Sequence, residues 1–251
     1  MQIYLVASPQ DLQKAARFSK NLICAAYRIG QNSALLREAS LSNCTGNLLF
    51  LSDLDAPPVA DAERLAQAVM WECRRKKYHG TVLDFEAAPT SDHLRFAKAI
   101  ANLSSTSGLS LYIPEKCAVP GSIPLINTAI SGGSLSDRLQ NFIGRNGTAA
   151  LDTQRLCMDF SLPAPSGMGR PFRPEQLTAM LHQWNPPVYF SQDLCAKYFT
   201  FTNCGQTHLI LYDDQDTLRQ KLQAGSSLGF RAAFLMYPEI ADLPSTFLQA
   251  L

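Results

Sequence analysis

Short apolar runs rich in β-branched residues alternate along the chain with stretches in which apolar residues recur every three or four positions. The first pattern predicts strands, and the second predicts helices that bury one face. Their alternation is typical of βα units around a parallel sheet. Eight strands are predicted, at residues 3–7, 23–28, 48–51, 81–85, 109–113, 156–160, 188–190 and 231–237. A ninth apolar run, at 123–130, is expected inside an enlarged connection at about 115–152.

Two amphipathic helices are predicted between these strands. The second is expected to begin at Ser91, a residue type that caps helices, and to end near Gly108. In the first, the apolar residues follow i, i+3, i+4 spacing and form one stripe that would lie on the sheet. This stripe consists of Ala62, Leu65, Ala66, Val69, Met70 and Cys73.

Two architectures fit the alternation, a closed barrel and an open doubly wound sheet. No phosphate-binding glycine loop such as G-x-G-x-x-G follows a predicted strand, although this loop is the main sign of a nucleotide-binding open sheet. The length of 251 residues is typical of a TIM barrel. We therefore predict an α/β protein with a (β/α)₈ TIM barrel, formed by residues 1–251 as a single domain.

Composition and charge exclude several function classes. Hydrophobic residues make up 46% of the chain, which is enough to build a sizeable core. The formal net charge of +1 gives no field that would gather nucleic acid or an anionic membrane, so neither is expected as a partner. No uncharged apolar run approaches the roughly 20 residues that a membrane span needs. The histidines and cysteines lack metal-ligand spacing, so no metal and no cofactor are expected.

The first residues and the cysteines bear on location. The chain starts without the basic segment and the apolar length of a signal peptide. An odd number of cysteines without a C-x-x-C pair favours free thiols in a reducing compartment. As written, the sequence is therefore expected to be cytoplasmic. The seven cysteines are Cys24, Cys44, Cys73, Cys117, Cys157, Cys195 and Cys204.

The stretch from His79 to Pro89 carries the most informative chemistry. Side chains alternate along a strand, so Val82, Asp84 and Glu86 share one face near its carboxyl end, where barrel enzymes hold their catalytic groups. Two carboxylates this close cannot both ionise cheaply when partly buried, so one of them should hold a proton near neutral pH. An acid beside an ionised carboxylate is what glycoside cleavage requires. The alternative is an acidic strand end that is solvated or closed by a salt bridge.

This stretch resembles the motif D-G-x-D-x-D-x-E on the fourth barrel strand of glycoside hydrolase family 18. His79, Gly80, Val82, Asp84 and Glu86 occupy its places, so the last Asp and the Glu are kept. A second match resembles the closing run of the same family, and the Asp-Phe-Glu variant is similar to its spore-cortex lysin branch. This closing run consists of residues 188–191, 198–201, 211–214, Leu218, Lys221, 228–230 and 233–237.

The resemblance implies a retaining glycoside hydrolase that acts on β-linked N-acetylglucosamine polymers or oligosaccharides. It implies that Glu86 protonates the glycosidic oxygen and that the substrate's own 2-acetamido group attacks the anomeric carbon. Asp84 would orient that group and stabilise its charge. Because Glu86 shares the strand end with Asp84, we expect the proton donor Glu86 to have a raised pKa. The spore-cortex branch also leaves a spore- or envelope-associated location open.

Three positions depart from the family pattern. Val82 replaces an Asp that shares a proton with its neighbour. Residues 155–160 align with M-x-Y-D-F, which places Met158 where a tyrosine hydroxyl supports the acetamido oxygen and keeps Asp159. Met236 or Tyr237 stands where a tryptophan forms the floor of the sugar site, and Tyr112 is expected to line the cleft from the fifth strand. The predicted substrate-binding residues are therefore Asp159, Met158, Tyr112 and Tyr237.

Three hypotheses follow from this sequence. The first is the glycosidase; the second is a catalytically impaired barrel that acts as a glycan-binding or structural protein; the third is an unrelated barrel enzyme with an Asp/Glu pair. The departures at Val82 and Met158 favour the second, and the intact Asp84-Phe85-Glu86 favours the first. An open groove in front of Asp84 and Glu86 would agree with the first two hypotheses, whereas a salt bridge closing them would contradict the enzyme.

Overall fold

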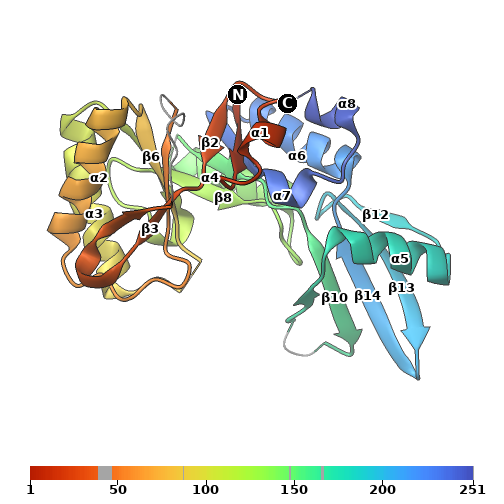
Figure 1. Ribbon diagram of the computed structural model, residues 1–251. Coiled ribbons are helices and arrows are strands. Elements are labelled where there is room, and N and C mark those ends of the chain that lie inside the picture. Colours follow the sequence, from red (N-terminus) through yellow and green to blue (C-terminus); the bar gives the residue numbers. More distant parts are fainter. Residues whose placement is uncertain (39–46, 87, 147, 165–166, 251) are drawn as a thin grey trace.

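Short parallel strands form one curled sheet at the centre of the molecule (Figure 1). The computed structural model describes residues 1–38, 47–86, 88–146, 148–164 and 167–250. Within them the sheet has ten strands in the order β2-β1-β15-β9-β8-β7-β6-β5-β3-β4, all parallel to their neighbours except β4. The strands are β1 Gln2–Ala7, β2 Leu22–Cys24, β3 Tyr27–Ile29, β4 Leu35–Arg37, β5 Leu49–Ser52, β6 Gly80–Asp84, β7 Ser110–Pro114, β8 Ile123–Asn127, β9 Ala150–Asp152 and β15 Ala232–Met236.

The two ends of this sheet are joined by the chain itself. Strand β2 lies at one end of the order, β3 pairs with β5 near the other end, and Ala25 and Ala26 alone separate β2 from β3. Between β2 and β5 no backbone ladder is seen in the described residues; instead the Asn47 side-chain amide donates to the carbonyl of Leu22 at 2.7 Å. The predicted α/β class and barrel-like curl are thus confirmed, but the sheet is open in its hydrogen bonds, and a complete (β/α)₈ closure is not seen.

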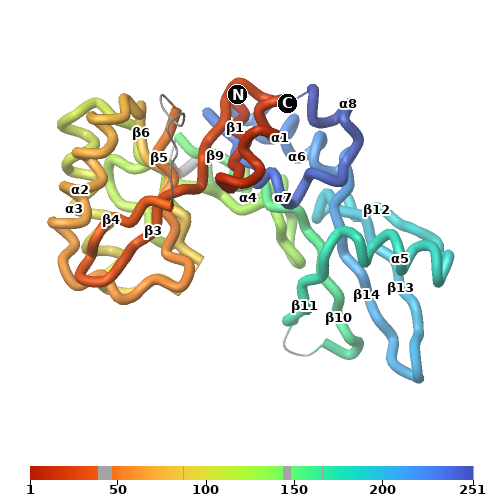
Figure 2. The backbone as a smooth tube through the Cα atoms, in the orientation of Figure 1, coloured from red at the N-terminus to blue at the C-terminus, as the bar shows by residue number. Residues whose placement is uncertain are grey.

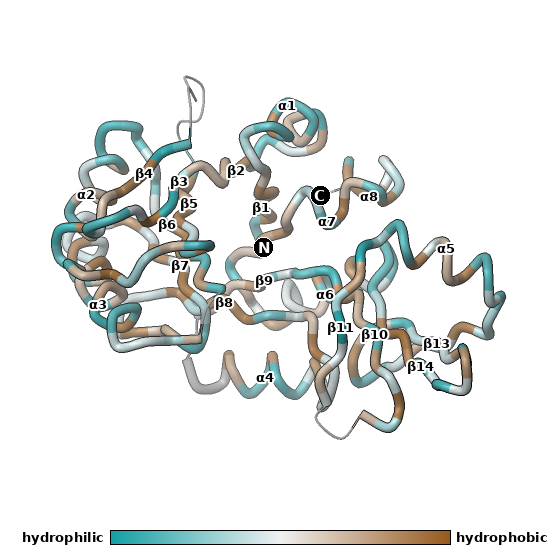
Figure 3. Tube along the Cα trace, turned by 60° about the horizontal axis from the view of Figure 1, so that its bottom comes forward, coloured by the Kyte–Doolittle hydropathy of each residue, from teal (hydrophilic) through white to brown (hydrophobic). Residues whose placement is uncertain are grey.

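The interior of the curl is a single apolar cluster. Its members come from β1, β2, β5, β6, β7, β8, β9 and β15, so the parallel strands face a common centre. Figure 3 shows hydrophobic stretches along β1, β6 and β7, with α2, α3 and α4 outside them. The cluster consists of Tyr4, Val6, Ile23, Leu48, Phe50, Val82, Tyr112, Leu125, Ala150, Ala232 and Phe234.

Helices cover the outer face of the sheet in two groups. Helices α2 (Ala62–Lys76) and α3 (Ser91–Thr106) enclose one outer core, in which the predicted stripe of α2 is buried as expected. Thr90 rather than Ser91 caps α3, because its hydroxyl accepts the His93 N–H at 3.2 Å. The second group packs around another core and consists of α1 Leu12–Ala15, α4 Leu135–Asn146, α6 Gln215–Ser227, α7 Tyr237–Ile240 and α8 Ser245–Leu248.

A second, antiparallel sheet is inserted between β9 and β15. It projects to one side of the curled sheet, away from the two chain ends, and carries helix α5 (Pro174–Trp184) (Figure 2). Leu177 of α5 packs against Phe199 of this sheet. Its order is β11-β10-β14-β13-β12, formed by β10 Cys157–Leu162, β11 Arg170–Pro171, β12 Tyr189–Ser191, β13 Ala196–Asn203 and β14 Gln206–Tyr212.

This insertion corrects two of the predicted barrel strands. The runs at 156–160 and 188–190 belong to the inserted sheet, whereas β8 and β9 are the strands that continue the curled sheet. The long connection therefore spans 153–231 and not 115–152. The physical reason is length, because β9 has three residues and shows no periodicity, while the inserted strands have the apolar runs of ordinary core strands.

A fully buried ion pair fixes the return from the insertion to the curled sheet. Lys221 Nζ lies 2.7 Å from Asp213 Oδ2, and both side chains are shielded from solvent. The same carboxylate accepts the Leu156 N–H at 2.9 Å and the Thr217 hydroxyl at 2.8 Å. Asp213 thus joins the start of the insertion, its end and helix α6, and a buried charge satisfied in this way is costly to disrupt.

Gly80 controls how closely β6 and β7 approach. A Cβ at this position would lie 2.3 Å from the carbonyl oxygen of Ser110 in the paired strand. Gly80→Ala should therefore destabilise the protein by about 1–3 kcal/mol, because the backbones must separate. Urea unfolding measures this, with Gly132→Ala as the control, since a Cβ there meets no atom of the described chain within 4 Å. Equal stability of the two variants would contradict the close approach.

Candidate active site

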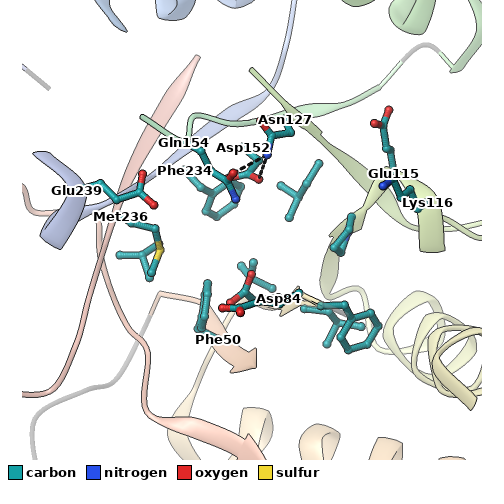
Figure 4. A pocket seen from close by; sticks show the side chains of 17 residues that line it. Phe50, Asp84, Glu115, Lys116, Asn127, Asp152, Gln154, Phe234, Met236 and Glu239 are labelled. Atoms are coloured by element: carbon teal, nitrogen blue, oxygen red, sulfur yellow. Dashed lines mark hydrogen bonds between the residues drawn. The ribbon is translucent and has the colours of Figure 1, made fainter. Parts of the chain in front are cut away.

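Asp84 and Glu86 lie where β6 ends and meet a cavity of about 480 Å³ at the carboxyl ends of the strands. Val82 belongs to the interior cluster, whereas Leu83 and Phe85 pack in the outer core between β6 and α3. The alternation predicted for this strand end therefore holds, with Asp84 and Glu86 on the cavity side. In Figure 4 the Asp84 carboxyl points into the cavity. Asp84 is half-buried and Glu86 is exposed.

Five carboxyl side chains line this cavity. Among the described residues, Asp84 and Glu86 take part in no ion pair, so the strand end is not closed by a salt bridge. Glu115, at the start of the 3₁₀ turn η2 (Glu115–Cys117), is paired with Arg138 of α4, and Lys116 beside it also lines the cavity. The five carboxyl residues are Asp84, Glu86, Glu115, Asp152 and Glu239.

The surroundings of Asp84 make its carboxyl a weak acid. Burial raises its pKa to about 6, and the negative charges of Glu86 and Asp53 add to the rise, while a hydrogen bond from Ser52 opposes it. The sequence hypothesis gave the raised pKa to Glu86, whereas the structure raises the pKa of Asp84.

Asp152 is a second weak acid in the cavity, and sequence reasoning missed it. It ends β9, and its Oδ2 receives a hydrogen bond from Asn127 Nδ2 at 3.4 Å. Burial raises its pKa to about 7, with further contributions from Asp84 and Glu239. Glu239 of α7 also has a raised pKa because of burial, opposed by the Arg155 N–H that its Oε2 accepts at 2.9 Å.

Apolar side chains complete the cavity. Phe50, Phe234 and Met236 line it, and Met236 is one of the two residues that the sequence offered for the floor (Figure 4). Tyr237 instead starts α7 and is buried, with its ring 6.3 Å from that of Phe18. Tyr112 is buried in the interior cluster, with its ring 5.0 Å from Phe234. The structure therefore does not bring either tyrosine to the cavity lining.

The other two predicted substrate-binding residues lie in the inserted sheet. Met158 of β10 lines a neighbouring cavity of about 340 Å³, which Gln154 and Glu239 share with the first. Asp159 contacts His208 of β14, with Oδ1 2.8 Å from the ring Nδ1. The match of residues 155–160 to a barrel-strand motif was therefore an alignment to the wrong strand, and the structure does not place Met158 or Asp159 beside Asp84.

A buried Asp–His contact supports the strand end that carries Glu86. Asp53, just after β5, accepts the Glu86 N–H at 2.8 Å through Oδ1, and its Oδ2 lies 3.3 Å from His93 Nε2. His93 Nδ1 accepts the Thr90 N–H at 3.3 Å, so the ring hydrogen is on the nitrogen that faces Asp53. The His93 ring stacks on Phe85 at 4.7 Å. The first turn of α3 thereby holds the backbone of Glu86 in place.

Two further findings concern the described residues alone. No group of three or more His, Cys, Asp or Glu side chains among them is arranged so that it could hold a metal ion. None of their helices is both long and apolar enough to cross a membrane. Cys73, Cys117, Cys157, Cys195 and Cys204 are free thiols, and Cys44 lies outside the described residues.

Asp53→Asn separates charge from backbone support. The Asn keeps an oxygen for the Glu86 N–H but removes a negative charge that raises the pKa of Asp84, so this pKa should fall. A ¹³C-NMR titration of the Asp84 carboxyl measures the change. Asp55→Asn, two residues further on and exposed, is the control and should leave it unchanged. An unchanged or higher pKa in Asp53→Asn would contradict this electrostatic link.

Comparison with known proteins places the fold. No protein-family model and no curated protein matches the chain. Among solved structures, a chitinase from Chromobacterium violaceum matches with a TM-score of 0.71 and 14% identity, over 99% of this chain and 97% of that chain. The Bacillus cereus spore cortex-lytic enzyme SleL matches with a TM-score of 0.70 and 12% identity, over 99% of this chain and 73% of that chain. A family GH18 chitinase from Cycas revoluta matches with a TM-score of 0.65 and 12% identity, over 100% of this chain and 98% of that chain. The chain therefore has the fold of glycoside hydrolase family 18 chitinases and spore cortex-lytic enzymes.

Proposed function

We propose that this protein is a retaining glycoside hydrolase that acts on β-linked, N-acetylglucosamine-containing glycans by substrate-assisted catalysis. The observation that carries the proposal is the strand end at Asp84 and Glu86, where two carboxyls without cationic partners among the described residues face a cavity. The fold supports it, because the solved structures that share the fold are chitinases and spore cortex-lytic enzymes.

The different environments of the two carboxyls suit different roles. Glu86 is exposed at the cavity and serves as the general acid that gives its proton to the glycosidic oxygen. Asp84 is deeper, and a pKa of about 6 leaves it mostly ionised at neutral pH. Its carboxylate accepts the acetamido N–H and offsets the positive charge that forms on this group.

The reaction then proceeds in two balanced steps. In the first, the bond between C1 and the glycosidic oxygen breaks as the acetamido oxygen bonds to C1, and Glu86 becomes a carboxylate. In the second, Glu86 takes a proton from water, the water oxygen bonds to C1 from the side that the leaving group occupied, and the acetamido group is released. The configuration at C1 is therefore retained, and no carboxylate nucleophile is required.

The shape of the site supports a polymeric or oligomeric substrate. Phe50, Phe234 and Met236 offer an apolar surface to a sugar ring. The second cavity adjoins the first through Gln154 and Glu239, which gives room for further sugar units toward the inserted sheet. A Cycas revoluta chitinase variant among the matching structures contains (GlcNAc)₄, which agrees with this class of ligand.

A second candidate function is a glycan-binding protein with impaired catalysis. One observation favours it, because neither a tyrosine nor a tryptophan lines the main cavity in the described part of the chain. A hydroxyl that supports the acetamido oxygen is worth on the order of 10²–10³ in rate in comparable sites. Binding with negligible hydrolysis would support this candidate.

Glu86→Gln tests the proton donor. The Gln keeps size and hydrogen bonding but has no proton to give, so kcat on β-linked GlcNAc oligosaccharides should fall about 10²–10⁴-fold with little change in binding. Reducing-end release measures kcat, and calorimetry measures binding. Glu63→Gln, exposed on α2, is the matched control and should keep wild-type turnover. If wild type and Glu86→Gln hydrolyse every GlcNAc polymer equally poorly while both bind it, the binding protein replaces the enzyme.

Asp84→Asn tests the second carboxyl through pH. In the wild type, turnover should fall as the pH drops through about 6, because protonation removes the charge that faces the acetamido group. Asn has no charge at any pH, so kcat should be lower throughout and the fall near pH 6 should disappear. A kcat–pH profile measures this, and an acid limb that persists near pH 6 in Asp84→Asn would assign it to another group.

A further inference from the structure

A separate cleft of about 380 Å³ lies between helix α2 and the antiparallel pair β3–β4, at the end of the molecule away from the inserted sheet (Figure 1). It shares no lining residue with the two cavities near Asp84. Its charged lining residues are Arg37, Arg64, Arg75 and Glu72, so cations outnumber anions there. The active-site cavity has the opposite sign, because five carboxyls and one lysine line it. The two sites therefore suit different chemical groups.

One stripe of α2 forms a long wall of this cleft. Arg64, Ala68, Trp71 and Arg75 follow each other at intervals of four, three and four residues, so their side chains leave the helix on one face. At a rise of roughly 1.5 Å per residue, this wall is about 16 Å long. The small Ala68 lies between larger side chains and leaves the wall concave. A wall of this length fits a stretch of a polymer better than a single small ion.

Hydrogen bonds join the two walls of the cleft. The Tyr27 hydroxyl of β3 donates to Glu72 Oε1 of α2 at 2.8 Å. Near the start of α2, the Asp61 N–H donates to Ser33 Oγ at 2.8 Å, and Ser33 lines the opposite wall. The cleft is therefore held open by the fold, and a preformed site loses less entropy when it binds a ligand.

Trp71 offers an apolar surface in this cleft. Its side chain is 63% exposed, more than that of any other aromatic residue in the described part of the chain. The Arg75 guanidinium lies 5.2 Å from the centre of its ring. A flat indole held open in a cleft can pack against the apolar face of a ring.

The arginines offer positions for a carboxylate. Arg75 Nε and Nη2 donate to the two carboxylate oxygens of Glu72 at 2.8 and 2.7 Å, so a bidentate arginine–carboxylate pair already forms in this cleft. Arg64, at the other end of the stripe, makes no ion pair in the described residues. Its guanidinium can therefore bind a carboxylate from outside in the same geometry.

We propose that this cleft is a second glycan-binding site, which takes a glycan with carboxylate groups by packing a sugar ring on Trp71 and pairing a carboxylate with Arg64. The inference takes the glycan from the proposed function, whereas the carboxylate follows from the charge of the cleft. Charge alone would also suit an acidic polypeptide, and the exposed indole favours the sugar. Because the cleft is separate from the active-site cavity, it holds a polymer near the enzyme without occupying Asp84 and Glu86.

Calorimetry with an oligogalacturonate and its methyl ester tests the charge. The two probes have the same sugar rings, but the ester has no carboxylate. The wild type should bind the acid at least about tenfold more tightly than the ester, because only the acid forms charge-assisted hydrogen bonds with arginine. Added salt should weaken binding of the acid and leave that of the ester unchanged. Equal affinity for the two probes would contradict the proposal.

Two variants separate the roles of Arg64 and Trp71. Arg64→Gln should weaken binding of the acid about tenfold and leave that of the ester unchanged, because only a charge is lost. Trp71→Ala should weaken binding of both probes about tenfold, because the surface for the ring is lost. Both side chains are exposed, so the fold should tolerate these changes. Arg17→Gln is the matched control, since Arg17 is exposed and lies outside the cleft.

Fluorescence locates the bound glycan. The chain has two tryptophans, and Trp184→Phe leaves Trp71 as the only one. The oligogalacturonate should change the emission of this variant in a saturable way. An unchanged emission, or tighter binding of polyglutamate than of the oligogalacturonate, overturns the proposal. These experiments measure binding and not turnover, so their failure would leave the proposed glycosidase standing, and an inactive enzyme would leave the cleft standing.

Discussion

Folding removes the carboxyl groups of Asp84, Asp152 and Glu239 from bulk water in one cavity, and the chemistry of the site depends on this burial. Burial is the largest cause of the raised pKa in each of the three. Nearby negative charges add to the rise in the two aspartates, and Lys116, although it lines the same cavity, pairs with none of the three in the described structure. The cavity must therefore hold protons close to neutral pH.

The fold creates this constraint by bringing distant segments to one edge. Strands β6 and β9 run parallel, so their carboxyl ends meet at the same side of the curled sheet, and α7 follows β15 at that side. Arg155, at the entry to the inserted sheet, holds Glu239 through its N–H and its guanidinium. The buried Lys221–Asp213 pair fixes the segment that leads from the inserted sheet back to the curled sheet. The rim of the acidic cavity thus depends on how the insertion is anchored, and not on the curled sheet alone.

The sequence predicted well wherever a pattern was long enough to be periodic. The stripe of α2 and the alternation through Val82 and Asp84 were both expected correctly. The curl of the sheet was expected too. The division of residues 23–28 into β2 and β3 at Ala25 and Ala26 was not expected, because two small residues between two short strands do not indicate where the backbone hydrogen bonding of a sheet ends. The structure-based comparison confirmed the family resemblance at the level of the fold.

Asp152 shows why the rest of the site could not be predicted. Its strand, β9, has only three residues, so in the sequence the Leu-Asp pair at its end cannot be distinguished from the start of a loop. The run through Met158, in contrast, has the length and the residue types of a barrel strand end, and only its antiparallel pairing with β14 shows otherwise. Pairing direction depends on contacts distant in sequence, which local patterns do not contain.

The raised pKa values also separate what these carboxyls do for folding from what they do for function. In the unfolded chain an aspartate ionises near 3.8, whereas folded Asp84 and Asp152 ionise near 6 and 7. Their contribution to stability is therefore fully present below the unfolded pKa and is lost as the pH rises through these values. Asp214, whose pKa Lys197 and the backbone of α6 hold below 3.8, has the opposite effect and stabilises the fold above its unfolded pKa. At neutral pH the cavity carboxyls thus oppose folding, so the fold alone gives no reason to place them there. Groups that weaken a fold and converge on one cavity are the mark of a site built for a ligand.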